Sequence, residues 1–171
     1  WDTNTTGGDA GAIMITGDHL NVYNVTFTNC TAVGRGGAIF LQDNFNATFD
    51  LCVFENNRAL GTANNTYNND NDTSSGLNRE LTGDGGAIGF DTGATFGIIK
   101  DSKFINNTAA RDGGAISYAE GSSNTTMYNV SFVNNTAFND GGAIFLQGHY
   151  GIINASIFEN NRAVGLGNGA L

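Results

Sequence analysis

The hexapeptide FENNRA occurs at residues 54–59 and again at residues 158–163, and it marks the repeat that decides the fold. Three variants share its aromatic, amide and alanine positions: FTNCTA at 27–32, FINNTA at 104–109 and FVNNTA at 132–137. The phenylalanines of these stretches are separated by 27, 50, 28 and 26 residues. Self-similarity at a period of about 20–50 residues is the signature of a repeat architecture. We therefore interpret the hexapeptide as one corner of each repeat, and not as a ligand site used twice.

A second motif, Gly-Ala-Ile, alternates with the first along the whole chain. It reads AGAI at 10–13 and GGAI at 36–39, 85–88, 113–116 and 141–144. The long interval of 50 residues then equals one repeat plus an insertion of about 22 residues, which lies within residues 61–82. That segment is polar and low in complexity, so we expect it to be a loop inserted into one repeat.

The composition favours short strands and tight corners. Glycine accounts for 25 residues and proline for none, and asparagine pairs recur throughout the chain. Glycine and asparagine adopt left-handed backbone angles most readily, whereas Gly, Asn, Thr and Ser are weak helix formers. No apolar run approaches the ~20 residues that a membrane-spanning helix needs, so we expect no transmembrane segment.

Each repeat carries apolar residues with a period of two, which is typical of the inward face of short strands. One repeat cannot bury its apolar side alone, but stacked repeats can. We therefore predict a single all-β domain over residues 1–171, a right-handed parallel β-helix of about five to six three-strand coils with the one inserted loop. The alternatives fit less well, because a β-propeller blade needs about 40–45 residues and a β-sandwich does not require Asn at a fixed corner.

A parallel β-helix places equivalent residues of successive coils above one another, about 4.8 Å apart. We expect the repeated phenylalanines to form an aromatic stack inside the coils: Phe27, Phe54, Phe104, Phe132 and Phe158. We expect the asparagine two positions after each of them to form a hydrogen-bonded ladder at a corner: Asn29, Asn56, Asn106, Asn134 and Asn160.

The alternation of GGAI with Phe-x-Asn-Asn resembles the repeats of polymorphic outer membrane proteins and of adhesin-like surface proteins of methanogenic archaea. The resemblance covers the chain outside residues 61–82. It implies a right-handed β-helix stalk on the cell surface, with an adhesive or architectural role. The sequence shows no anchor segment, and because it begins at Trp1 we expect a processed form or a segment of a longer protein.

The net charge of −9, from 7 basic and 16 acidic residues, limits the classes of molecule that the chain can bind. Binding to nucleic acid requires a basic surface, as does electrostatic docking on anionic lipid, so the charge argues against both. The motifs at the two ends resemble open coils, and bare β-helix ends are sheet edges that invite pairing. We therefore expect adjoining repeats or copies of the chain to pack end to end, and cell-surface or host glycans or proteins to contact the sides.

Carboxylates before the Gly-Gly pairs keep an enzymatic interpretation open. In register this position reads Asp9, Arg35, Asp84, Asp112 and Asp140. Stacked carboxylates are costly unless they are solvated, cap amides or share a cation, so Asp84, Asp112 and Asp140 are candidate Ca²⁺ ligands. The competing interpretation is that each Asp opens an Asp-Gly-Gly turn. Because the position follows the repeat and does not stand out in one coil, we favour the turn and assign no catalytic residue.

Two alternative functions nevertheless remain open. A polysaccharide lyase or hydrolase built on a β-helix would concentrate its acids and bases in two or three coils. A carbohydrate-binding module would expose aromatic side chains, for which Tyr23, Tyr67 and Tyr128 are the candidates.

Sequons for N-linked glycans are dense, and glycans are the only bound groups we expect besides Ca²⁺. The glycosylation candidates are Asn4, Asn24, Asn46, Asn64, Asn71, Asn124, Asn129 and Asn154. Sequon residues Asn29, Asn106 and Asn134 belong to the predicted ladder, so we expect them to be buried and unmodified. Cys30 and Cys52 lie in neighbouring repeats but out of register, so we favour two buried thiols over a disulfide.

Overall fold

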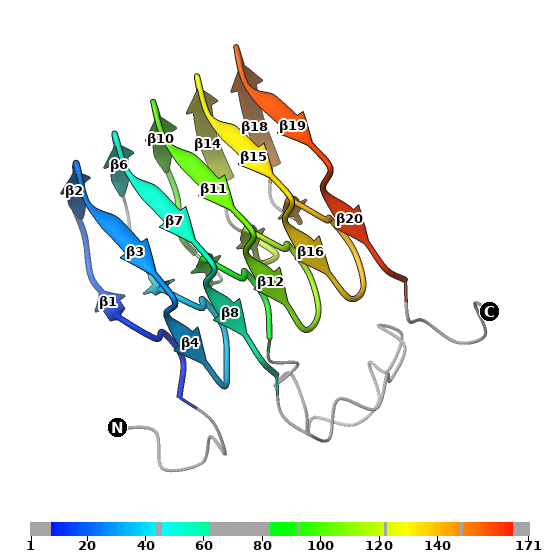
Figure 1. Cartoon of the computed structure of the whole chain (residues 1–171). Helices are drawn as coiled ribbons and strands as arrows, with labels where there is room; N and C mark the ends of the chain where they lie inside the picture. Colours follow the sequence, from blue (N-terminus) through cyan, green and yellow to red (C-terminus); the bar gives the residue numbers. More distant parts are fainter. Residues whose placement is uncertain are drawn as a thin grey trace.

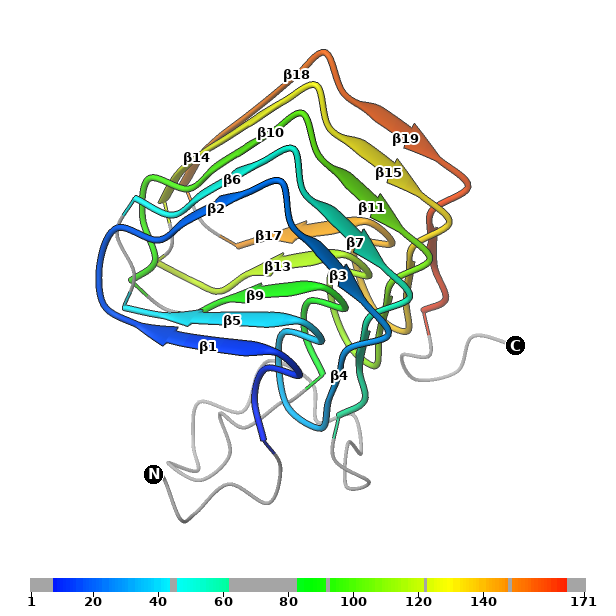
Figure 2. The same ribbon diagram turned by 60° about the vertical axis from the view of Figure 1, so that its left-hand side comes forward.

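The computed structural model describes residues 8–43, 46–61, 83–91, 93–121, 123–147 and 149–165. These residues form a parallel β-solenoid without helices, in which each strand pairs with the equivalent strand of the neighbouring turns (Figure 1). Figure 2 looks obliquely along the stack and shows the chain winding past the same four sides in each turn. The predicted insertion lies outside the described residues except for Gly61.

Four parallel sheets form the sides of the solenoid, and each has five strands. The first sheet contains β1 (Ile13–Thr16), β5 (Ile39–Gln42), β9 (Ile88–Phe90), β13 (Ile116–Tyr118) and β17 (Ile144–Leu146). The second contains β2 (Asn21–Tyr23), β6 (Thr48–Asp50), β10 (Ile98–Lys100), β14 (Ser123–Tyr128) and β18 (His149–Asn154). The third contains β3 (Thr26–Thr28), β7 (Val53–Glu55), β11 (Lys103–Ile105), β15 (Ser131–Val133) and β19 (Ile157–Glu159). The fourth contains β4 (Thr31–Ala32), β8 (Arg58–Ala59), β12 (Thr108–Ala109), β16 (Thr136–Ala137) and β20 (Arg162–Ala163).

The parallel β-solenoid predicted from the sequence is confirmed, but the prediction of three strands per coil is wrong. Each coil has four strands, and the five strands of each sheet span about four turns, fewer than the five to six coils predicted. The additional strand is the two-residue segment that ends in the repeated alanine, such as Arg58–Ala59. It is a separate strand because a left-handed corner at Asn56, with φ of 56°, breaks it from β7. The right-handed sense of the coil stays a prediction.

The core is a set of columns of equivalent residues. Strand register pairs each repeated phenylalanine with the next, Phe27 with Phe54 and Phe104 with Phe132 among them. Their rings stack in parallel, with centroid separations of 4.9, 4.7, 5.0 and 4.8 Å from Phe27 to Phe158. Phe54, Phe104 and Phe132 are fully buried. The predicted aromatic stack is therefore present, and it holds consecutive coils in one register.

Each Gly-Gly pair lets two stretches of backbone approach closely inside a coil. The first glycine of the pair, such as Gly85 with φ of 66°, adopts the left-handed conformation. The second glycine has no room for a side chain: a Cβ at Gly86 would lie 2.7 Å from the backbone of Thr108 and would clash with the carbonyl of Gly114. The fourth sheet consequently packs closely against the beginning of the first sheet at this corner.

Candidate functional site

The asparagine two positions after each repeated phenylalanine forms the corner between the third and fourth sheets. Its backbone is left-handed, with φ between 53° and 56°, and its side chain is exposed to solvent. These residues are Asn29, Asn56, Asn106, Asn134 and Asn160. Asparagine tolerates this backbone conformation better than other non-glycine residues do, which explains its recurrence there.

The second asparagine of each Asn-Asn pair forms the buried ladder. Both the backbone N–H and the side-chain amide of Asn57 donate to Oδ1 of Asn107, each over 3.0 Å. Asn107 donates in the same way to Asn135, and Asn135 to Asn161. Each side-chain amide also donates to the carbonyl of a phenylalanine in the preceding coil, as Asn107 does to Phe54 over 3.0 Å. Asn57, Asn107 and Asn135 are fully buried.

The prediction that Asn29, Asn56, Asn106, Asn134 and Asn160 form the ladder is therefore wrong by one position. If the period-two alternation of the strand continued through the corner, the second residue after Phe would point inward. A left-handed residue at that point reverses the alternation, so the third residue after Phe points inward instead. The Asn-Asn pair was the available signal, because a corner and a ladder each need one asparagine.

Three sequon residues lie at this corner, so its exposure bears on whether they can be glycosylated. Asn29, Asn106 and Asn134 are exposed, so the expectation that burial protects them from modification is wrong. Among the other candidates, Asn24, Asn46, Asn124, Asn129 and Asn154 are exposed, whereas Asn4, Asn64 and Asn71 lie outside the described residues. The side-chain amide of Asn129 donates to Asp101 over 2.6 Å. Glycosylation at any of these positions stays a prediction.

The column of acidic residues before the Gly-Gly pairs joins each coil to the next one. Oδ1 of Asp84 accepts a hydrogen bond from the backbone N–H of Asp112 over 3.2 Å, and Oδ1 of Asp112 accepts one from Asp140 over 3.0 Å. Asp9 accepts the equivalent bond from Arg35 over 2.7 Å. The carboxylates thus cap amides of the following coil.

Two arginines neutralise this column. Arg111 lies 3.3 Å from Asp84 and 3.1 Å from Asp112, and Arg35 lies 3.5 Å from Asp9. Burial raises the pKa of Asp84 to about 7, against the opposing effect of Arg111 and with a further increase from the charge of Asp112. Burial likewise raises the pKa of Asp112, while Arg111 opposes the change.

The candidate Ca²⁺ ligands do not come together as a metal site. The described residues contain no group of three or more His, Cys, Asp or Glu side chains that could hold a metal ion. Asp84 and Asp112 instead face the guanidinium of Arg111, while Asp140 is exposed to solvent. The arginine occupies the place at which a shared cation would relieve the repulsion between the carboxylates.

The two cysteines are free thiols with no disulfide between them, but the expected burial of both holds only for Cys52. Cys52 is fully buried, and its backbone N–H donates to the hydroxyl of Ser102 over 3.0 Å. Cys30 is only partly buried and occupies the ladder position of the first coil, where later coils have Asn. Its backbone N–H donates to Oδ1 of Asn57 over 3.0 Å. Burial raises the pKa of both thiols.

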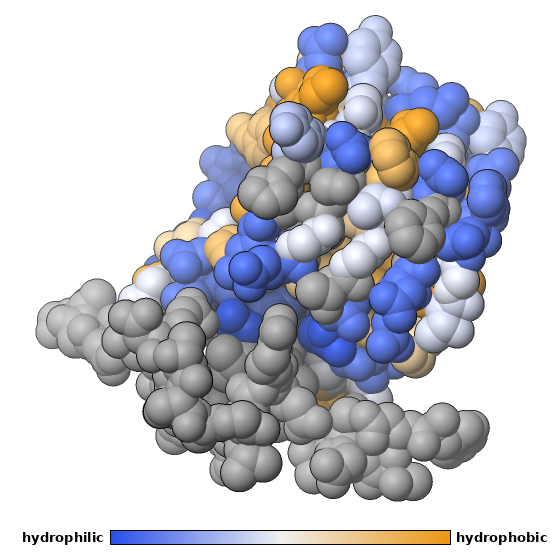
Figure 3. Space-filling model, turned by 180° about the vertical axis from the view of Figure 1, so that it is seen from behind, coloured by the Kyte–Doolittle hydropathy of each residue, from blue (hydrophilic) through white to orange (hydrophobic). Residues whose placement is uncertain are grey.

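The outer face of the second sheet changes from coil to coil. One column of this face reads Tyr23, Asp50, Lys100, Tyr128 and Asn154. The two tyrosines are 62% and 52% exposed, and Lys100 forms an ion pair of 2.9 Å with Asp50 between them. Figure 3 views the molecule from behind, where hydrophilic residues predominate and hydrophobic ones form small separate groups. The sides of the solenoid therefore present mixed surfaces on a constant core.

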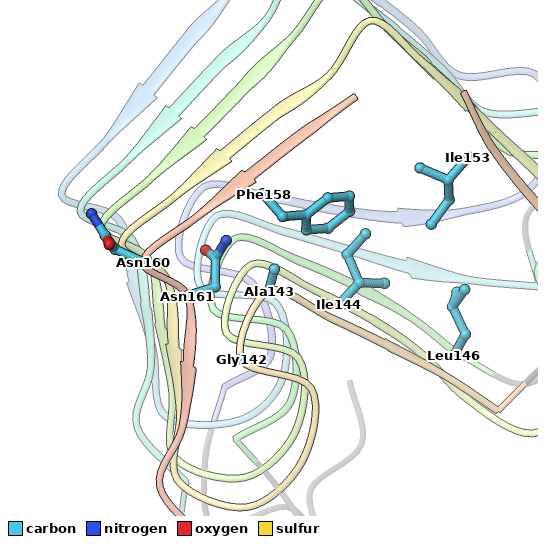
Figure 4. A pocket seen from close by; sticks show the side chains of 8 residues that line it. All are labelled: Gly142, Ala143, Ile144, Leu146, Ile153, Phe158, Asn160 and Asn161. Atoms are coloured by element: carbon cyan, nitrogen blue, oxygen red, sulfur yellow. The ribbon is translucent and has the colours of Figure 1, made fainter. Parts of the chain in front are cut away.

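The last coil, β17–β20, leaves an apolar hollow of about 480 Å³ at its open end. Ile144, Leu146, Ile153 and Phe158 point into this hollow from three sheets (Figure 4). Phe158 is 49% exposed, in contrast to the fully buried Phe132 beneath it. Figure 4 also shows Asn161 inside the coil and Asn160 outside it. The hollow is thus the uncovered surface of the repeated core.

These columns allow the repeat to be compared with known families. Residues 101–118 and 129–147 match the Chlamydia polymorphic membrane protein repeat. The matched stretches contain the Phe-Asn-Asn corners at Phe104 and Phe132 and the GGAI motifs that follow them, so they confirm the resemblance to polymorphic membrane proteins. A polymorphic membrane protein repeat in a β-solenoid fits a surface structural protein of the adhesin-like kind.

Comparison with curated proteins and with solved structures finds no match. Among the residues that the structure describes, no helix has the length and apolar character needed to cross a membrane.

Proposed function

We propose that this chain is a non-catalytic structural segment of an extracellular, cell-surface β-helix with an adhesin-like role. The observation that carries the proposal is the combination of a constant interior with a variable exterior. The inward columns repeat phenylalanine and asparagine in successive coils, whereas the column from Tyr23 to Asn154 differs at nearly every position. A rigid scaffold with independently variable outer residues suits an extended binding surface.

The match to the polymorphic membrane protein repeat supports the location on the cell surface. The acidic net charge of −9 suits a soluble exterior and disfavours nucleic acid and anionic lipid as partners. The best candidate for a catalytic cluster is the column of acids, and its members Asp84 and Asp112 are engaged by Arg111 and by backbone amides. This engagement favours a structural role for them over acid–base catalysis.

End-to-end packing belongs to the same proposal. It is supported by the exposed core of the last coil, where Phe158 and Ile153 are open to solvent and offer an apolar surface to a further coil. A further coil placed there would repeat the ring stacking of 4.7–5.0 Å that joins the coils below. The chain then acts as part of a longer rod that carries its outer faces away from the cell.

Surface display can be tested with antibodies raised against the purified chain. We expect them to label intact cells of the source organism, and we expect protease treatment of the intact cells to remove the signal. Labelling that appears only after permeabilisation would overturn the proposal. Incubation of the chain with polyuronides tests the enzymatic alternative, because release of unsaturated or reducing ends would establish a lyase or a hydrolase.

A further inference from the structure

The two ends of the described solenoid differ in how far their core residues are covered. In the first coil, Val22 and Phe27 are each 7% exposed, although no described coil precedes them. In the last coil, the equivalent Ile153 and Phe158 are 43% and 49% exposed. The C-terminal end is therefore the one that presents an uncovered core to an additional coil.

The asparagine ladder also distinguishes the two ends, because its asparagines donate to one another toward the C-terminal end of the solenoid. In each coil boundary from Asn57 to Asn161, the lower asparagine donates two hydrogen bonds to Oδ1 of the upper one. Asn161 accepts such bonds from Asn135 and donates its side-chain amide to the carbonyl of Phe132 over 2.8 Å. Its backbone N–H and the second hydrogen of its amide have no acceptor among the described residues. The last coil therefore offers two donors toward any coil placed on it.

The first coil of a second copy could not accept hydrogen bonds from those two donors. Its ladder position is Cys30, whose side chain has no carbonyl oxygen. If the first coil of a second copy covered the last coil, Asn161 would become buried like Asn135, which is fully buried, with both donors unsatisfied. An unsatisfied buried donor is strongly destabilising compared with one that is paired.

We propose that the open end of the last coil selects a following coil with asparagine at the third position after its phenylalanine, and that Cys30 excludes the first coil of an identical copy. The partner is thus the next repeat of a continuing solenoid and not another copy of this chain. This inference rests on the end-to-end packing proposed above and adds its specificity. The contact that continues is the coil–coil interface already present at each boundary below.

The experiment lengthens the chain by one coil. A copy of residues 138–163 is inserted after Ala163, once unchanged and once with the copy of Asn161 replaced by Cys. We expect the unchanged version to protect the amides of β19 from hydrogen exchange about tenfold more strongly than the Cys version, because it provides the missing acceptor. Equal protection in the two lengthened chains would overturn the role of the asparagine.

A second measurement uses the chain without any extension. Sedimentation velocity should show that the Cys30→Asn variant associates end to end about tenfold more tightly than the original chain, with Cys30→Ala as the matched control. End-to-end association of the original chain at the same concentrations as Cys30→Asn would overturn the exclusion of identical copies. Neither measurement depends on surface display, so a failure here is distinguishable from a failure of the adhesin-like role.

Discussion

The side-chain amide of Asn107 donates to the side-chain oxygen of Asn135 over 3.0 Å, although 28 residues separate them in the sequence. The same oxygen accepts the backbone N–H of Asn107, also over 3.0 Å. Each buried asparagine thus satisfies its own polar atoms only through the neighbouring coils. This mutual dependence makes the ladder a set of linked contacts and not a series of independent turns.

Replacement of Asn107 by Ala should strongly destabilise the solenoid. The change removes the acceptor of two donors of Asn57 and the donor to the carbonyl of Phe54, and all three groups are buried. At about 1–3 kcal/mol for each unsatisfied group, we expect a loss of more than ~3 kcal/mol in the free energy of unfolding, measured by urea denaturation. Asn106→Gly is the matched control, because Gly suits the φ of 54° at this exposed corner. The assignment of the ladder fails if the two variants lose similar stability.

Removal of a ring from the middle of the aromatic stack should cost more than removal of the last ring. Phe104 is fully buried between Phe54 and Phe132, with centroid separations of 4.7 and 5.0 Å. We expect Phe104→Ala to lower the free energy of unfolding by about 3–5 kcal/mol. Phe158→Ala should cost less than half as much, because Phe158 is 49% exposed and stacks on one side only. Denaturation curves with similar midpoints for both variants would contradict this reading of the open end.

A methyl group at Gly86 should prevent close packing of the backbone. The added Cβ would lie 2.7 Å from the backbone of Thr108. That backbone cannot move without disturbing the pairing of β12 with its neighbouring strands β8 and β16. We expect Gly86→Ala to lower the melting temperature clearly, at a cost of more than ~2 kcal/mol. Gly8→Ala provides the control, because no atom lies within 4 Å of a Cβ at that position. Equal melting temperatures for the two variants would show that the corner has spare room.

Stability should depend on pH through the largely enclosed carboxyl of Asp84. Because burial raises its pKa to about 7 in the folded state, above the ordinary value near 3.8, the folded state holds this proton over a range in which the unfolded state has lost it. The contribution of Asp84 is therefore fully present below about pH 4 and is lost as the pH rises toward 7. The raised pKa of Asp112 acts in the same direction.

Urea denaturation between pH 5 and pH 8 tests this dependence. We expect the original chain to lose stability as the pH rises from 5 to 7, by up to ~1.4 kcal/mol per pH unit for one proton. Asp84→Asn should flatten the profile over this range, whereas Asp140→Asn, at an exposed position of the same column, should leave it largely unchanged. A profile of Asp84→Asn that parallels that of the original chain would contradict the assignment to Asp84.

The sequence was sufficient to predict the parallel β-solenoid and its aromatic stack. Repetition places equivalent residues of successive coils in register. An apolar residue that recurs once in every coil then has to lie inside, because only the interior of the stack removes it from water. The same reasoning predicted the wrong number of strands per coil and assigned the ladder to the wrong asparagines. Both errors arise at Asn56 and its equivalents, where a left-handed residue separates two strands and reverses the direction of the side chains that follow.

The sequence by itself thus determined the repeat, the parallel β-solenoid and the identity of its aromatic column, because these depend only on periodicity and apolar character. Only the tertiary structure decided which asparagine is buried, which carboxylates share Arg111 and which end of the stack remains open. Those features depend on backbone angles at the corners and on contacts between residues about one coil apart. Hydrogen bonds and ion pairs are sensitive to direction and distance, whereas hydrophobic burial is not directional, so composition and spacing could predict the core but not its polar connections.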